Sequence, residues 1–264
     1  MAATSRPVTP ADYPWTMSTG EVPGQPQHRR GPSDARWNNA AGAAGSTDLD
    51  RIYESRFSHD DATDKDRIWV EVCAFLQRFV DADQPVLDVA ADRGYFIRHI
   101  HATERWATDL RDLRGALDPE IKFVEANGPA MSEKLPHDYF GTVFMSNYLE
   151  HLPDSSVVLR QLREAYAVTR PGGTVLILQP NIRLVGAAYW DFLDHHTALT
   201  EKSLQEAAEL AGYETSQIIT RFLPFTTKSR LPQAPWLVRW YLRVPPMRWL
   251  LGKQSLYVGT RPAS

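Results

Sequence analysis

Apolar residues are spaced along the chain in two alternating patterns. Short apolar runs bounded by turn residues are typical of buried strands, whereas spacings of three and four residues are typical of one helix face. Strands are predicted at residues 86–89, 105–109, 121–125, 139–147, 174–178, 217–222 and 255–259. Helices are predicted at residues 68–79, 94–102, 153–170 and 201–211.

Residues at the helix ends refine these limits. We expect Asp64 or Asp66 to cap the first helix, because a carboxylate can accept hydrogen bonds from its first N–H groups. Residues 171–173 (Pro-Gly-Gly) should stop the third helix, and Gly212 should cap the fourth. The alternation of strands and helices predicts an α/β fold with a mostly parallel sheet covered on both faces. Ligands of such sheets bind at the carboxyl ends of the strands.

Residues 1–48 differ from the rest of the chain because Pro, Gly, Ala, Ser and Thr dominate them. Such a segment buries too little apolar surface to offset its ordering entropy, so we expect a disordered or draped tail. Residues 49–264 are expected to form one domain, in which residues 223–252 are a lid-like helical insertion before the last strand.

Composition narrows the class of protein. The 264 residues are 43% hydrophobic and carry a formal net charge of −3, which argues against a nucleic-acid partner recognised through bulk charge. The single cysteine, Cys73, lies in an apolar helical pattern and is expected to be a buried, inert thiol. The sequence has no signal-peptide pattern and no long apolar run, so we expect a soluble, cytoplasmic protein.

The loop after the first strand, residues 88–94, is a candidate nucleotide-binding turn. A strand that turns sharply into a helix must let its backbone approach a ligand closely, which requires small residues. Ala90, Ala91 and Gly94 meet that need. Asp109 ends the second strand, 21 positions beyond Asp88. A carboxylate there can accept both ribose hydroxyls of a nucleoside.

Four features together resemble class I S-adenosylmethionine-dependent methyltransferases, in particular a bacterial, methyltransferase type 11-like subgroup. They are the strand at 86–88, Asp109, the run 146–153 (Ser-Asn-Tyr-Leu-Glu-His-Leu-Pro) and the run 170–178 beginning Arg-Pro-Gly-Gly. The resemblance implies a Rossmann-like, doubly wound sheet of seven strands with an antiparallel last strand. It also implies S-adenosylmethionine as cofactor.

The first loop departs from the family pattern, because Ala90 and Asp92 stand where glycines are usual. Asp92 is expected to pair with the α-ammonium of the cofactor or with Arg93. Asn127 corresponds to the residue near the adenine amino group, although a simple turn role is an equal alternative. The predicted cofactor-binding residues are Asp88, Ala90, Asp92, Gly94, Asp109, Asn127 and Asn147.

Histidines and acids follow the fourth and fifth strands, where the acceptor is expected. His151, beside Glu150, is the first candidate for a general base; the alternative is that it only supports its loop. Asp194, His195 and His196 form a second catalytic candidate group, in which Asp194 orients one imidazole. A metal held by Glu150, His151 and this loop is an alternative, but spacing alone predicts no metal site.

The expected reaction is in-line methyl transfer to an oxygen of a small molecule or glycan intermediate, with nitrogen and carbon acceptors left open. The glycan expectation comes from the subgroup resemblance. Residues 236–250 combine Trp236, Trp240 and Arg243, which is typical of a lid or homodimer surface, or of peripheral membrane contact. The altered glycine loop keeps two alternatives open: a non-methylating enzyme that uses the cofactor as a structural or electrostatic element, and a cofactor-free binding protein.

Overall fold

The computed structural model describes residues 59–225 and 235–263, which lie in one compact unit, Tyr53–Ser264. The predicted tail at 1–48 and residues 226–234 of the insertion lie outside the described residues. The strands are β1 (Val86–Val89), β2 (Arg105–Asp109), β3 (Lys122–Glu125), β4 (Phe140–Ser146), β5 (Thr169–Pro180), β6 (Glu214–Leu223) and β7 (Gln254–Thr260).

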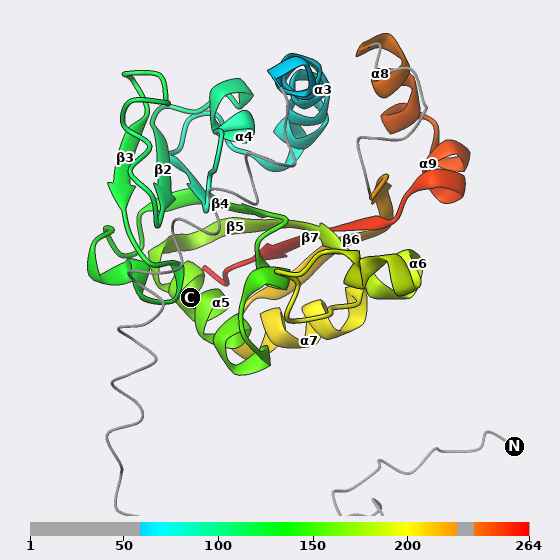
Figure 1. Cartoon of the computed structure of the whole chain (residues 1–264). Coiled ribbons are helices and arrows are strands. Elements are labelled where there is room, and N and C mark those ends of the chain that lie inside the picture. Colours follow the sequence, from blue (N-terminus) through cyan, green and yellow to red (C-terminus); the bar gives the residue numbers. More distant parts are fainter. Residues whose placement is uncertain (1–58, 226–234, 264) are drawn as a thin grey trace, which may run out of the picture. The chain divides into compact units, whose positions relative to one another are not determined.

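These strands form one sheet with the order β3-β2-β1-β4-β5-β7-β6 (Figure 1). Strands β3, β2, β1, β4 and β5 pair in parallel, and β7 runs antiparallel to both of its neighbours. The predicted α/β fold, with a mostly parallel seven-stranded sheet and an antiparallel last strand, is therefore confirmed. The strand order reverses between β1 and β4, which is where ligands of doubly wound sheets bind.

Helices cover both faces of the sheet (Figure 1). One face carries α3 (His59–Leu76), α4 (Tyr95–His99), α8 (Pro235–Arg243) and α9 (Pro245–Leu251). The other carries α5 (Ser155–Val168), α6 (Ile182–Val185) and α7 (Glu201–Ala211). Short 3-10 helices are η2 (Gln77–Phe79), η3 (Gly128–Glu133), η4 (Leu149–His151) and η5 (Gly186–Asp191).

The central strand β1 shows why the predicted strands read as continuous apolar runs. All four of its residues are buried, since helices cover the sheet on both sides. Val86 belongs to the apolar core beneath α3 and α4. Leu87 and Val89 belong to the core beneath α5 and α7. The alternation of side chains along a strand therefore directs Asp88, like Val86, toward the α3 and α4 face.

Two predicted helix starts and ends agree with the structure. The helix predicted to open at residues 153–155 begins as α5, where Asp154 Oδ1 accepts from the backbone N–H groups of Ser156 at 2.8 Å and Val157 at 3.1 Å. Gly212 ends α7 in the left-handed conformation, with φ at 111°. That conformation favours glycine, as the sequence predicted.

Three predictions about helix ends were wrong. Helix α3 begins at His59, so Asp64 and Asp66 lie inside it and not at its N-terminus; the Asp66 carboxylate contacts His99 Nε2 at 2.9 Å. Helix α4 covers only five residues of the predicted 94–102. Helix α5 ends at Val168, before the Pro-Gly-Gly run, because β5 begins at Thr169, which pairs with Phe140 of β4. Pairing across the sheet outweighed the local turn signal.

Candidate active site

The loops that follow β1, β2 and β3 meet at the carboxyl ends of adjacent strands. Ala91 N donates to Thr108 O of β2 at 3.1 Å, and Ala126 N, after β3, donates to Asp109 O at 3.0 Å. The 88–94 loop, Asp109 and Asn127 therefore lie side by side at one edge of the sheet, as the strand order requires.

The 88–94 loop keeps the backbone shape of a glycine-rich turn, although Ala90 and Asp92 replace two of its glycines. Ala90, Asp92 and Gly94 have φ of 55°, 47° and 68°. Residues with a β-carbon reach this left-handed region at a cost of roughly 1–2 kcal/mol each. The structure thus explains why glycines are usual at these positions, and Ala90 does not adopt the ordinary angles that would make alanine neutral.

Replacing Ala90 by glycine should raise the free energy of unfolding by about 0.5–1 kcal/mol, because relief of left-handed strain exceeds the added entropy of the unfolded chain. Its neighbour Ala91 is the matched control, since it is 9% exposed and is not among the positive-φ residues. Ala91→Gly should lower stability by about 1 kcal/mol. Thermal unfolding of both variants is the measurement, and shifts in the same direction would contradict the strain argument.

A three-residue ionic group links the loop to β2. Arg111 Nη2 contacts Asp92 Oδ1 at 2.7 Å, and Arg111 Nε contacts Asp109 Oδ1 at 3.2 Å. The backbone N–H of Asp92 donates to Asp109 Oδ2 at 3.1 Å. Asp92 thus has an ionic partner in Arg111, which sequence analysis did not name although it lies two residues after Asp109.

Asp88 is buried inside this edge, at 4% exposure. Burial raises the pKa of its carboxyl well above the usual range; the backbone N–H of Ile97 opposes this, and the charges of Asp109 and Asp92 add to it. The structure therefore places Asp88 under α4, where it supports the turn from within.

The two predicted asparagines are exposed at the same edge. Asn127 O accepts from Ala130 N at 3.0 Å, so its backbone makes the turn into η3. Asn147 follows β4 with φ at 48°, its N donates to Leu178 O at 2.8 Å, and its side chain donates to Ser146 Oγ at 3.0 Å.

The loop after η5 is fastened to η4, at the end of β4. The backbone N–H groups of His196 and Thr197 donate to Glu150 O at 2.8 and 3.1 Å, and Thr197 Oγ1 donates to Leu152 O at 2.7 Å. The buried Tyr189 hydroxyl donates to Thr197 O at 2.6 Å. These bonds bring together two segments that the sequence separates by more than 40 residues.

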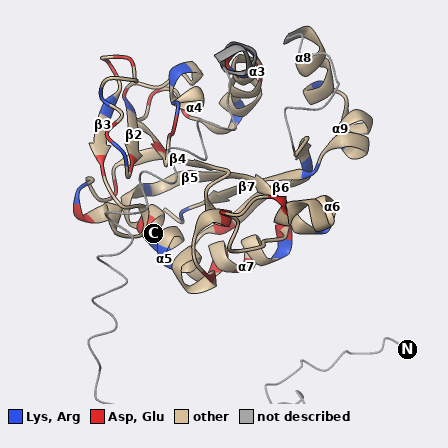
Figure 2. Cartoon of the chain, in the orientation of Figure 1, with Lys and Arg blue, Asp and Glu red and all other residues tan. Residues whose placement is uncertain are grey.

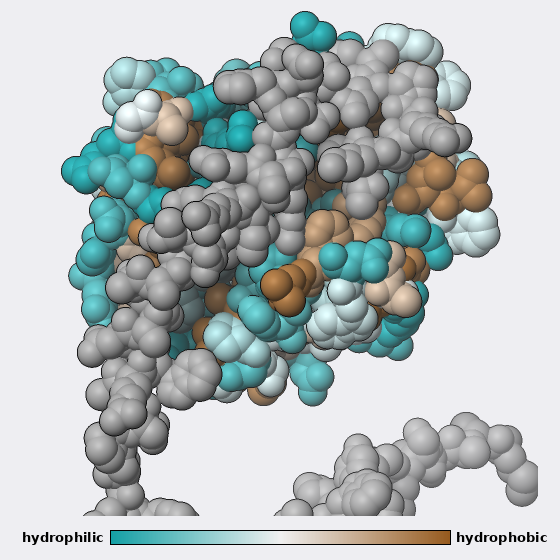
Figure 3. Space-filling view, viewed as in Figure 1, coloured by the Kyte–Doolittle hydropathy of each residue, from teal (hydrophilic) through white to brown (hydrophobic). Residues whose placement is uncertain are grey.

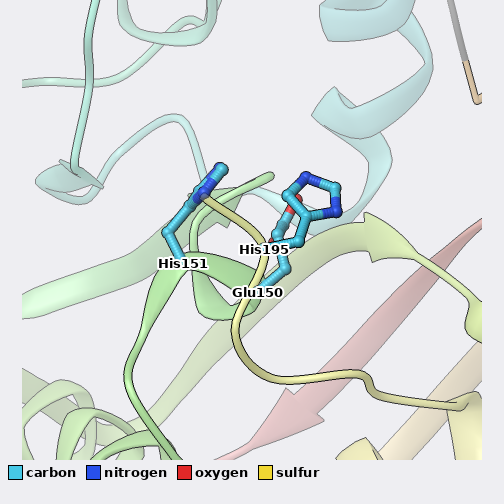
Figure 4. A group of neighbouring side chains, drawn as sticks. All are labelled: Glu150, His151 and His195. Atoms are coloured by element: carbon cyan, nitrogen blue, oxygen red, sulfur yellow. The ribbon is translucent and has the colours of Figure 1, made fainter. Parts of the chain in front are cut away.

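The result is a cluster of Glu150, His151 and His195 (Figure 4). One carboxylate oxygen and one ring nitrogen of each imidazole lie within 4.8 Å of one another. Asp194 Oδ2 lies 3.3 Å from His151 Nδ1, and the Asp194 carbonyl lies 2.9 Å from it. His195 Nδ1 faces Tyr189 O at 2.9 Å, with the ring stacked on Phe192.

Glu150 is the member of this cluster that the sequence did not single out as catalytic. It is 2% exposed, and burial raises the pKa of its carboxyl to about 7, opposed chiefly by the His151 charge. Its adjacency to His151 in one short helix was the available signal. His196, in contrast, is exposed and reaches the cluster through its backbone N–H.

Sequence comparison decides the family. The model of a methyltransferase-domain family matches residues 64–218, more than half of the chain. The chain belongs to this family. The resemblance to class I S-adenosylmethionine-dependent methyltransferases is thereby confirmed, and the family's cofactor is S-adenosylmethionine. No curated protein of similar sequence was found.

Solved structures share the fold at low sequence identity. A chain of the complex between the Haloferax volcanii Trm112 methyltransferase activator and a putative methyltransferase is 18% identical, with a TM-score of 0.56 over 77% of this chain and 95% of that chain. An S-adenosylmethionine-dependent methyltransferase from Archaeoglobus fulgidus is 16% identical, with a TM-score of 0.52 over 72% and 93%. The [4+2]-cyclase SpnF is 17% identical, with a TM-score of 0.52 over 74% and 81%.

Within the two described ranges, every helix is too short or too polar to cross a bilayer. Lys and Arg are interspersed with Asp and Glu on the elements around β2 and β3 (Figure 2).

Proposed function

We propose that this methyltransferase transfers the methyl group of S-adenosylmethionine to a hydroxyl oxygen of a small molecule or glycan intermediate. The observation that carries the proposal is the Glu150, His151 and His195 cluster, which follows β4, next to β1 and its loop. A sulfonium methyl is already activated, so only the acceptor needs chemical help. A cluster of proton-accepting groups suits an oxygen acceptor, which has a proton to lose.

The cofactor fits the chemistry of the residues at the edge of the sheet. Asp109 offers the carboxylate oxygens that two ribose hydroxyls need, and the left-handed turn at Ala90 and Asp92 lets the backbone approach a ligand. Asn127 and Asn147 are exposed on either side and could meet the adenine and the methionine portions. When bound, the cofactor supplies the electrophilic methyl group.

The proposed methyl transfer needs no reactant other than the cofactor and the acceptor. The acceptor oxygen forms a bond to the methyl carbon as the carbon–sulfur bond breaks, and the bonding pair stays on sulfur. The acceptor's proton passes to the cluster of Glu150, His151 and His195. Within this cluster, Asp194 holds the His151 imidazole in place.

Two side chains favour a sugar-like acceptor. Trp190 of η5, which precedes the loop of His195, is 56% exposed. An exposed indole face is a suitable platform for a sugar ring. Gln179, at the carboxyl end of β5, is 2% exposed, and its amide has no hydrogen-bond partner among the described residues. An amide that offers both a donor and an acceptor matches a hydroxyl.

The experiment is methyl transfer by the purified full chain from cofactor labelled in its methyl group. Acceptors should include free sugars, nucleotide sugars and lipid-linked sugars, with amines as the comparison. We expect label on a hydroxyl-bearing acceptor, in an amount equal to the S-adenosylhomocysteine formed. Absence of S-adenosylhomocysteine binding at millimolar concentration would sink the proposal.

A second candidate function is a non-methylating reaction that uses the cofactor as an electrostatic element. The strained, acidic loop at Ala90 and Asp92 favours it, and a cyclase is among the proteins with this fold. If the same assay converts an acceptor to a product that lacks the labelled methyl group, that product would identify this function.

We also propose that α8 and α9 contact an anionic bilayer, from which a lipid-linked acceptor would be taken. Trp236, Trp240, Trp249 and Leu250 are 63–71% exposed, and Figure 3 shows a hydrophobic patch over α9. Beside them, Arg78, Arg243 and Arg248 line a cavity of about 240 Å³. Exposed indoles with neighbouring guanidinium groups suit a phosphate headgroup region.

Co-sedimentation with vesicles of phosphatidylcholine and phosphatidylglycerol tests this surface. Binding should depend on the anionic lipid and weaken at high salt. Trp240→Ala and Trp249→Ala should each reduce vesicle binding about tenfold. Each substitution removes apolar side-chain area that the membrane would bury, and the burial of that area contributes roughly 1.5 kcal/mol or more to binding. Trp190→Ala is the matched control on another exposed indole. Unchanged vesicle binding in all three variants, or a homodimer that covers the same indoles in solution, would contradict the proposal.

A further inference from the structure

The carboxylate of Glu150 carries an unsatisfied atom inside the protein. The residue is 2% exposed, and its Oε2 has no hydrogen-bond partner among the described residues. A buried carboxylate oxygen without a partner costs free energy, so structures rarely keep one unless something else binds it. In this protein the nearest candidate ligand groups are the imidazoles of His151 and His195, which share the cluster.

Both imidazoles are held in a way that is typical of metal-binding histidines. His151 Nδ1 lies 2.9 Å from the Asp194 carbonyl and 3.3 Å from its carboxylate. His195 Nδ1 lies 2.9 Å from the Tyr189 carbonyl. Carbonyl oxygens only accept, so in the neutral ring each Nδ1 carries the proton and each Nε2 carries a lone pair. Metal-ligating histidines almost always donate their other N–H to a carboxylate or a backbone carbonyl.

We propose that Glu150, His151 and His195 bind a divalent first-row transition metal, such as Zn²⁺, with Asp194 and the Tyr189 carbonyl as the groups that orient the two imidazoles. Two imidazoles and one carboxylate favour such an ion over Mg²⁺, which prefers oxygen ligands alone. Three protein ligands leave a coordination position open for another molecule.

The distances allow the site with modest side-chain movement. One ring nitrogen of each imidazole and one carboxylate oxygen of Glu150 lie within 4.8 Å of one another. Around tetrahedral zinc, with bonds of about 2.0–2.1 Å, ligand atoms lie roughly 3.4 Å apart. The ligand atoms must therefore approach one another by about an ångström or somewhat more when the metal binds. Glu150 and the histidines come from η4 and from the loop fastened to it, so the backbone already holds them together.

The metal deepens the proposed function and rests on it. An acceptor hydroxyl in the open position would lose its proton more readily, because the cation stabilises the oxygen anion. The metal-bound imidazoles would have no lone pair to accept that proton, so in the metal-bound protein the proton would leave to solvent and not to the cluster, and the oxygen would attack the methyl carbon as described above. The transfer of a methyl group consumes no electrons from the metal, so neither an oxidant nor a reductant is required.

Metal binding can be measured without activity. The full chain is stripped with a chelator, dialysed and titrated with ZnCl₂ by calorimetry; visible absorption of bound Co²⁺ gives a second readout of coordination. We expect one equivalent to bind. Glu150→Gln and His195→Ala should weaken binding at least 100-fold, and Asp194→Asn about 10- to 100-fold. His137→Ala is the control, because His137 is exposed and precedes β4, away from the cluster.

The outcomes separate the two proposals. Absence of stoichiometric binding, or equal binding by wild type and the cluster variants, overturns the metal site. Full methyl transfer by the stripped protein overturns its role in the reaction while leaving the proposed function standing. Specific metal binding without any methyl transfer supports the site and overturns the proposed function. Thermal unfolding of each variant shows that altered binding does not reflect a lost fold.

Discussion

Replacing Asp109 by alanine is expected to weaken the binding of S-adenosylhomocysteine roughly 30- to 150-fold. The variant loses two hydrogen bonds from ribose hydroxyls to a charged acceptor, together worth about 2–3 kcal/mol. Asp109 is buried, and its carboxylate is held by Arg111 and by the backbone N–H of Asp92. A preorganised acceptor of this kind loses little entropy on binding. Calorimetry with the purified variant gives the affinity directly.

Asp112→Ala is the matched control for this change. Asp112 lies three residues further along the same loop, is exposed and pairs with Arg114, so its loss removes the same charge without touching the site. The affinity of Asp109→Asn for S-adenosylhomocysteine should lie between those of Asp109→Ala and Asp112→Ala, because asparagine keeps the shape of the side chain and one acceptor oxygen. Wild-type affinity in Asp109→Ala, with the fold intact by thermal unfolding, would remove Asp109 from the cofactor site.

Replacing His151 by alanine should lower turnover about 10²- to 10⁴-fold and leave the affinity for S-adenosylhomocysteine within a few-fold of wild type. The imidazole belongs to the cluster through which the acceptor loses its proton, and it lies outside the 88–94 loop and Asp109. A lower turnover with unchanged cofactor affinity distinguishes a role in the reaction from a general loss of structure. Single-turnover methyl transfer measures the first quantity, and calorimetry measures the second.

His137→Ala serves as control here as well, since it removes an exposed imidazole from the opposite end of β4. Asp194→Asn should give a smaller loss of turnover, because Asp194 acts by orienting His151. If His151→Ala turns over at the wild-type rate, His151 only supports its loop. His195 would then become the first residue to replace.

Most of the fold was predictable because its signals are local. Strands β1 and β2 have the limits that their apolar runs predicted, and the Gly212 cap of α7 follows from one residue type. The errors arose where a tertiary contact outweighed a local signal. Asp66 looked like a cap but lies inside α3 against His99, and the Pro-Gly-Gly run lies at an irregularity within β5, between its pairs Thr169–Phe140 and Thr174–Thr142.

The sequence by itself determined the α/β class, the order of strands and helices, and the family, and it predicted the edge of the sheet at which we place the site. Periodicity and motif spacing suffice for these, because they depend on residues a few positions apart. Only the tertiary structure decided that Ala90 and Asp92 adopt left-handed backbone, that Arg111 holds Asp92 and Asp109, and that His151 meets a loop 43 positions away. Those outcomes depend on how loops from different strands pack against one another, and no pattern along the chain encodes the distance between two such side chains.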